Sequence, residues 1–142
     1  MPAPDRVLAV VREWVVKAEN DLTNAAHVLK LAAECPTDTV CFHAQQCVEK
    51  YLKALLVFHG IDFPKTHDIE KLVALLPARA DTRLTAEEQG RLTDYATTTR
   101  YPGSGEMLLT EARRAVVLAR RVRRQVRSLL PSEIRRVRRG RP

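Results

Sequence analysis

Three separate stretches of the sequence carry side chains that could hold a phosphate group. Lys53 lies in the run "FHAQQCVEKYLKALL", Lys65 and His67 lie in "KTHD", and Arg100 and Tyr101 stand together in "TRYPG". Lysine and arginine bind phosphate through charge-assisted hydrogen bonds, and a histidine near its ordinary pKa can accept or donate a proton. These five residues are therefore the candidate phosphate- or nucleotide-binding residues.

The run that contains Lys53 is more polar than a core-forming helix requires. Gln46, Glu49, Lys50 and Lys53 recur at steps of three and four residues, so they share one strip of the expected helix. Buried polar groups persist when they are hydrogen-bonded, which favours a structural network between helices or subunits for Gln46, Glu49 and Lys50. Contact with a ligand is the alternative interpretation, and it applies first to Lys53.

Other site chemistries find little support. His43 and Cys47 are four residues apart, as two metal ligands on one helix can be, but no second pair has matching spacing. The sequence has no phosphate-binding loop, dinucleotide-binding fingerprint or nucleophile elbow. We therefore expect neither a metal nor a cofactor.

The elements that must position these residues are helices. Five segments have apolar residues at helical spacing or clear capping signals, and breaks such as Pro36, Gly60 and Pro77 separate them. "TAEE" at residues 85–88 is a capping box, and Thr66 or Asp68 caps the segment before it. The expected helices span about 5–33, 38–60, 68–76, 85–99 and 110–130.

The composition agrees with one helical domain. The chain has 142 residues, of which 45% are hydrophobic and 5% aromatic, with five glycines, so an all-β fold has little support. We predict an all-α, up-and-down bundle of about five helices over residues 5–130. Residues 131–142 are expected to form a disordered, arginine-rich C-terminal tail.

Positive charge is concentrated near the C-terminus. Residues 113–142 contain 12 arginines and one glutamate, whereas the whole chain has a net charge of +7. Such a segment could contact phosphates or an acidic partner, or it could be a solvated helix face.

Antiparallel packing predicts that the basic residues meet. The end of the second helix, the start of the third, the end of the fourth and the starts of the first and fifth would share one end of the bundle. That end would gather Lys53, His59, Lys65, His67, Arg100, Tyr101, Arg113 and Arg114. Helix N-termini would add backbone donors for a phosphate. The alternative is that His67 assists a helix cap and Arg100 pairs with Glu106 or Glu111.

The three quoted motifs occur in the order and spacing of the HEPN domain, and this resemblance covers nearly all of residues 7–130. It implies a helical bundle, frequent homodimers and a place in prokaryotic mobile or defence loci. HEPN proteins are often encoded beside a minimal nucleotidyltransferase, as a toxin–antitoxin pair.

The resemblance also bears on enzymatic activity. Many HEPN toxins are metal-independent ribonucleases with an arginine followed, after four to six residues, by a histidine. Residues 105–107, which follow Arg100 at that spacing, are Gly, Glu and Met. We therefore favour a non-catalytic module that contacts nucleotide or RNA phosphate and a nucleotidyltransferase partner. The alternative is a divergent endoribonuclease that uses Arg100 with His67 or Tyr101.

The location is expected to be the cytoplasm. The sequence has no apolar run of about 18 residues that could span a membrane, and its first residues lack the pattern of a secretory signal. Three cysteines are an odd number at spacings that do not suggest a disulfide framework, which favours a reducing compartment.

Overall fold

A computed structural model describes residues 4–97, 101–103 and 105–135. Every regular element in this part of the chain is a helix, so the predicted all-α bundle is confirmed. The elements are α1 (Asp5–Leu29), η1 (Ala32–Glu34), α2 (Thr37–Phe58), α3 (Ile69–Leu75), α4 (Ala86–Ala96), α5 (Leu109–Ser128) and α6 (Ser132–Arg135). None of the described helices is long and apolar enough to cross a membrane.

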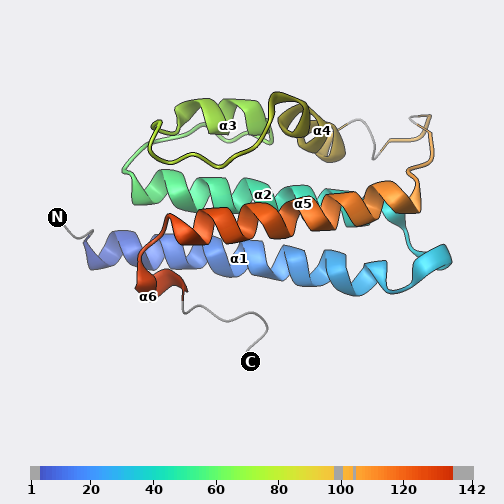
Figure 1. Ribbon diagram of the computed structural model, residues 1–142, viewed down its shortest axis with the longest axis horizontal. Helices are drawn as coiled ribbons and strands as arrows, with labels where there is room; N and C mark the ends of the chain where they lie inside the picture. The colour runs from blue at the N-terminus through green and yellow to red at the C-terminus, as the bar shows by residue number, and fades with distance from the viewer. Residues whose placement is uncertain (1–3, 98–100, 104, 136–142) are drawn as a thin grey trace.

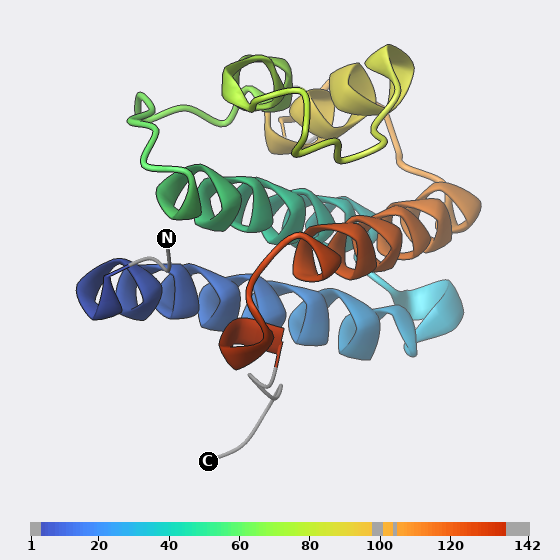
Figure 2. The same cartoon turned by 60° about the vertical axis from the view of Figure 1, so that its left-hand side comes forward.

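The helices form two layers. The long helices α1, α2 and α5 lie side by side, and the shorter α3 and α4 lie over α2 on the side away from α1 (Figures 1 and 2). The short α6 folds back against α1. The middle helix, α2, therefore contacts every other long element and is the most deeply buried of them.

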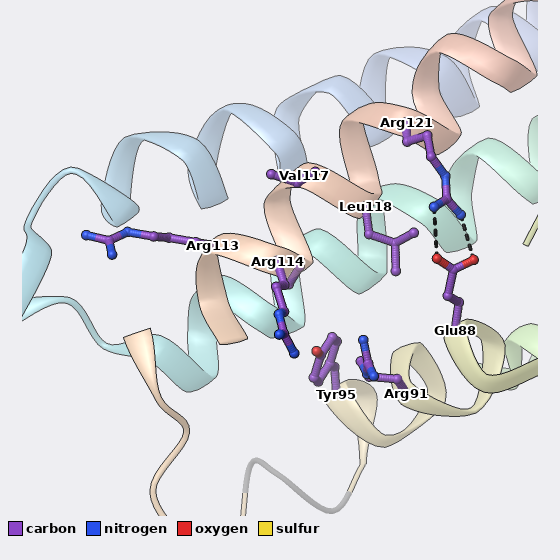
Figure 3. A pocket seen from close by; sticks show the side chains of 9 residues that line it. Glu88, Arg91, Tyr95, Arg113, Arg114, Val117, Leu118 and Arg121 are labelled. Atoms are coloured by element: carbon purple, nitrogen blue, oxygen red, sulfur yellow. Dashed lines mark hydrogen bonds and ion pairs between the residues drawn. The ribbon is translucent and has the colours of Figure 1, made fainter. Parts of the chain in front are cut away.

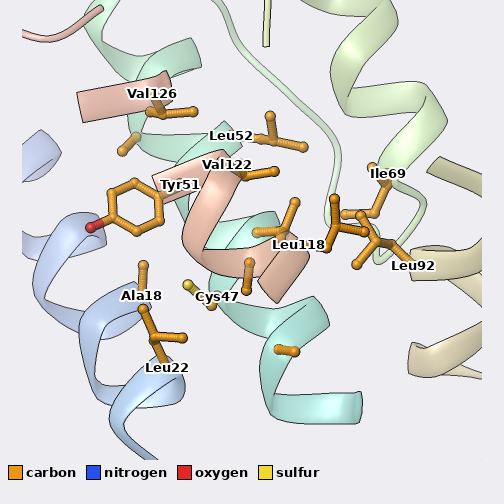
Figure 4. Close-up of a cluster of buried hydrophobic side chains, with 14 of the residues drawn as sticks. Ala18, Leu22, Cys47, Tyr51, Leu52, Ile69, Leu92, Leu118, Val122 and Val126 are labelled. Atoms are coloured by element: carbon orange, nitrogen blue, oxygen red, sulfur yellow. The ribbon is translucent and has the colours of Figure 1, made fainter. Parts of the chain in front are cut away.

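The apolar stripes that the sequence predicts form the core. Val11, Ala18 and Leu22 of α1 are buried. Ala18 and Leu22 face Cys47 and Tyr51 of α2 (Figure 4). On α5, Ala112, Ala115, Ala119, Val122 and Val126 recur at steps of three and four residues, and all five are buried. Figure 4 shows side chains from α1, α2, α5 and the α3–α4 layer meeting in one cluster.

The helix caps explain where the short helices begin. Thr85 and Glu88 make both hydrogen bonds of the predicted capping box at the start of α4. The Asp68 carboxylate accepts a hydrogen bond from the Lys71 backbone N–H at 3.1 Å, so Asp68 rather than Thr66 is the N-cap of α3. Gly60 follows α2 with a φ of +69°, the left-handed conformation expected of it.

The relative direction of the helices differs from the prediction. Thr37, at the start of α2, donates a hydrogen bond to the Met107 carbonyl just before α5, at 2.6 Å. Arg127, near the end of α5, contacts the Tyr51 hydroxyl in the later half of α2 at 3.3 Å. Hence α5 runs parallel to α2 and antiparallel to α1, because the α3–α4 layer carries the chain back to the end where α2 began (Figure 1). The prediction that α1 and α5 start at the same end is wrong.

Several boundaries also move. The first helix ends at Leu29 instead of residue 33, and Ala32 beyond it has a left-handed φ of +52°. The fourth ends at Ala96, three residues earlier than expected. At the C-terminus Ile134 of α6 is fully buried, so the packed domain extends beyond the expected boundary at residue 130. Residues 136–142 of the predicted tail lie outside the described part of the chain.

Candidate phosphate-binding site

Glu49 organises most of the polar strip on α2. Its carboxylate is 3% exposed and lies 3.0 Å from the Lys53 ammonium and 2.8 Å from Nδ1 of His67. Gln45, which is fully buried, donates to the same carboxylate at 3.1 Å and to the His67 carbonyl at 3.3 Å. Gln46 in turn donates to the Gln45 side chain at 2.7 Å. The cluster fixes the segment before α3 against the middle of α2.

Lys53 is more enclosed than a typical ligand-binding lysine. Its side chain is 9% exposed, and its ammonium lies 5.5 Å from the ring centroid of Trp14 and 5.7 Å from that of Phe63. A cation that already has a carboxylate and two aromatic rings around it gains little from a phosphate. Lys65 is exposed, two residues before His67.

Lys50 and His43 belong to a separate cluster on the α1 side of α2. The Lys50 ammonium lies 2.5 Å from one oxygen of Asp21, and Nδ1 of His43 lies 2.9 Å from the other. Cys47, which lies four residues after His43, is fully buried, and burial raises the pKa of its thiol well above the ordinary value. A thiol held protonated is a poor metal ligand. The described residues contain no group of three or more residues that could hold a metal ion.

Of the four predicted phosphate-binding residues that the structure describes, Lys53 and His67 meet at Glu49, but Tyr101 lies apart from them. His67 lies beside Gln45 and Glu49, whereas Tyr101 lines a hollow at the start of α2 together with Thr37. The helical rise of about 1.5 Å per residue places Thr37 and Gln45 about 12 Å apart along α2. Arg100 itself lies outside the described residues. Tyr101 does not meet Lys53 because the described part of the α4–α5 connection lies by the start of α2, and Lys53 lies in the later half of that helix.

A different arginine cluster lies between α4 and α5. A cavity of about 330 Å³ there is lined by Glu88, Arg91, Tyr95, Arg113, Arg114, Ala115, Val117, Leu118 and Arg121. Figure 3 shows the side chains of Arg91, Arg114 and Tyr95 pointing toward one another, while Arg113 extends away from them. Four of the lining residues are arginines, whereas the carboxylates at the cavity are those of Glu88 and the adjacent Glu111, so positive charge is in excess and this is the candidate anion-binding site.

Glu111 holds the centre of this site in its present geometry. Its carboxylate accepts a hydrogen bond from the Tyr95 hydroxyl, and it lies 3.7 Å from Arg91 and 3.9 Å from Arg114. Burial, followed by the hydrogen bond to Glu111, raises the pKa of Tyr95, so the phenol remains protonated and acts as a donor. The separations to the two guanidinium groups exceed hydrogen-bonding distance. Both arginines can therefore engage an incoming anion without breaking a close contact to Glu111.

Arg91 has one close ion pair, which lies on the surface. One of its terminal nitrogens lies 2.9 Å from Glu87, one turn earlier on α4. The Glu87 side chain is 81% exposed, and an exposed pair of this kind contributes little because water screens it. An anion in the cavity can therefore compete for the Arg91 guanidinium.

Arg121 closes the other side of the cavity. It contacts both oxygens of Glu88, at 2.6 Å and 2.8 Å (Figure 3). The hydrogen bond from Arg121 is the main reason why the pKa of Glu88 falls to about 2. Glu88 is thus ionised at neutral pH and keeps Arg121 in place as a wall of the cavity. Arg91 and Arg114 are therefore the arginines of this cavity that we expect to bind a ligand.

Sequence reasoning missed Arg91, Tyr95 and Glu111, and it assigned Arg114 to the wrong neighbours. The signal was present in part, since Arg114 and Arg121 are seven residues apart and so share a face of α5. The partner face on α4 could not be found without knowing that α5 runs parallel to α2.

Comparison with known proteins agrees with the motifs. Residues 11–129 match the model of the HEPN domain. The crystal structure of TT1696 from Thermus thermophilus is similar, with a TM-score of 0.70 and 28% sequence identity over 84% of this chain and 98% of that chain. No curated protein sequence matches the chain.

Proposed function

Because the chain belongs to the HEPN domain family, we propose that it is a non-catalytic HEPN module that binds the phosphate groups of a nucleotide or of RNA. The observation that carries this proposal is the cavity between α4 and α5, where Arg91 and Arg114 flank the Tyr95 hydroxyl. Guanidinium groups bind phosphate through two parallel charge-assisted hydrogen bonds. The Tyr95 hydroxyl already donates its one hydrogen bond to Glu111, so Arg91 and Arg114 supply the donors for the phosphate. Leu118 and Val117 give the cavity an apolar side against which a ribose or base can pack.

An endoribonuclease that uses Arg100 with His67 or Tyr101 is less well supported. Such an enzyme needs an acid or base within hydrogen-bonding reach of the reacting phosphate. His67 is bonded to Glu49 near the middle of α2, and Tyr101 lies by the start of that helix. No histidine is among the described residues that line the arginine cavity. The geometry therefore favours binding without cleavage.

Binding is tested by titrating a labelled RNA oligonucleotide and a nucleoside monophosphate with wild-type protein and with Arg114→Ala. Loss of one charge-assisted contact of about 1.5 to 3 kcal/mol should weaken binding of both ligands by tenfold or more. Arg12→Ala removes the same charge from an exposed position on α1 and should have no such effect.

Equal affinity of the wild type and of Arg114→Ala would refute the site. Cleavage of the RNA by the wild type, abolished by His67→Ala, would instead establish the enzyme. Arg114 and Arg12 are both exposed, so the two arginine variants should have the thermal stability of the wild type.

We further propose that the protein is a homodimer that works with a minimal nucleotidyltransferase in a toxin–antitoxin or defence system. Family membership supports this, as does the apolar surface that the described residues leave exposed. Leu31 is 54% exposed and Leu108 is 69% exposed, and both lie at the end of the bundle where α1 ends and α5 begins. Co-purification with the product of an adjacent nucleotidyltransferase gene would test the partner.

The dimer itself gives a quantitative expectation. Light scattering at micromolar concentration should give twice the chain mass of 16.1 kDa. Placing two like charges at a two-fold interface is unfavourable, so Leu31→Glu combined with Leu108→Glu should shift the mass toward that of the monomer. A monomeric wild type would refute the proposal.

A further inference from the structure

The outer face of α5 carries a row of exposed arginines that have no partner in the described part of the chain. Arg113, Val117, Arg120 and Arg124 follow one another at steps of three and four residues, and all four are exposed. No hydrogen bond or ion pair joins the three arginines to any residue that the structure describes. We call these four residues the α5 row. The inward-facing arginines, by contrast, all contact carboxylates: Arg121, Arg123 and Arg127.

A second hollow continues the arginine cavity along α5. It has a volume of about 390 Å³ and is lined by Thr82, Arg83, Arg121, Arg124 and Gln125. Arg121 lines both hollows, so they adjoin at this side chain. Arg124 belongs both to the second hollow and to the α5 row. The basic surface is therefore an elongated track, which starts at the arginine cavity and follows α5 toward its C-terminal end.

We propose that a single RNA strand lies along this track, with one phosphate held by Arg91 and Arg114 and later phosphates held by Arg120 and Arg124. This rests on the proposed function and names its ligand. Arg113 and Arg124 are eleven residues apart, or about 16 Å along the helix axis at 1.5 Å per residue. That length exceeds what one nucleotide can cover. A strand of several nucleotides carries one phosphate charge per nucleotide, so its charges repeat along its length as the arginines do along the track.

The composition of the track favours nucleic acid over a protein. A second copy of the chain docked on this face about a two-fold axis would place like charges opposite one another, which is repulsive. A protein partner would need apolar anchors, and Val117 is the exposed large apolar side chain that α5 offers here. The one aromatic residue of α4, Tyr95, is buried, and α5 has none, so these two helices offer bases no exposed ring to stack on. The strand is thus bound through its phosphates, with little dependence on its sequence.

The test compares two ligand lengths in the full chain. Fluorescence anisotropy with single-stranded RNA of two and of about ten nucleotides is measured for the wild type, for Arg120→Ala/Arg124→Ala, and for the control Arg6→Ala/Arg12→Ala. The control removes two exposed arginines from α1. The Arg120/Arg124 variant should bind the longer RNA at least tenfold more weakly and the dinucleotide as the wild type does.

The salt dependence gives a second readout. Each phosphate neutralised on a single strand contributes about −0.7 to the slope of log K against log salt concentration, so loss of two contacts should reduce the slope by about 1.4. An unchanged slope, an equal loss for the dinucleotide, or equal competition by polyglutamate would overturn the strand proposal. Loss of dinucleotide binding in Arg91→Ala/Arg114→Ala, with an Arg120/Arg124 variant that behaves as the wild type, would retain the cavity and reject the track.

Discussion

Replacing Glu19 with alanine should destabilise the protein by about 3 to 5 kcal/mol, the usual cost of removing one partner from a buried ion pair. Glu19 belongs to α1, is 2% exposed, and faces α5. Arg123 contacts both of its carboxylate oxygens at 2.9 Å, and Arg127 lies 3.3 Å from one of them. Its removal leaves two guanidinium groups near the core without their carboxylate.

Urea denaturation measures the loss of unfolding free energy. The comparison is valid when the slope of this free energy against urea concentration is the same for the variant and the wild type. Glu13, on the same helix but exposed, is the matched control, and Glu13→Ala should change stability by less than about 0.5 kcal/mol. A loss below about 1 kcal/mol for Glu19→Ala would mean that Glu19 does not join α1 to α5 as the contacts indicate.

Replacing Glu49 with alanine should have an effect of similar size, for a related reason. The change leaves the enclosed Lys53 without a carboxylate and removes the anchor of His67. Substituting both partners by apolar residues of similar size, as in Glu49→Leu/Lys53→Met, should restore much of the stability, because no unpaired charge then remains.

The same variants separate a structural role from a ligand-binding role. If Lys53 serves structure alone, Glu49→Leu/Lys53→Met should bind RNA as the wild type does. Weaker RNA binding by a stably folded double variant would show that Lys53 contacts the phosphate. It would contradict a phosphate site between α4 and α5. Denaturation and anisotropy measured on the same samples distinguish the two outcomes.

Local signals in the sequence located the five longer helices but did not specify all of their ends or their arrangement. The capping box at Thr85 and the break at Gly60 depend on nearby residues alone, and both are found as predicted. The direction of α5 depends on how far the α3–α4 layer carries the chain, which no local pattern specifies. That single difference moved the expected site, because it separates Tyr101 from Lys53 and places Arg114 beside Arg91.

The polar strip on α2 shows the same limit. Helical spacing placed Glu49 and Lys53 on one face, and they do form an ion pair. Spacing could not show that His67 and the aromatic rings of Trp14 and Phe63 would surround them. Those contacts come from other parts of the chain, and they join Glu49 and Lys53 to a network within the fold.

Phosphate binding between α4 and α5 can be observed by NMR of the arginine Nε–Hε groups. Spectra are recorded while a short RNA is titrated into the full chain, with assignments made from single arginine variants. If phosphate binds in this cavity, the Arg91 and Arg114 signals should shift together and saturate, while the signals of Arg6 and Arg12 on α1 stay in place. Shifts confined to arginines outside this cavity, with Arg91 and Arg114 unchanged at saturating RNA, would contradict it.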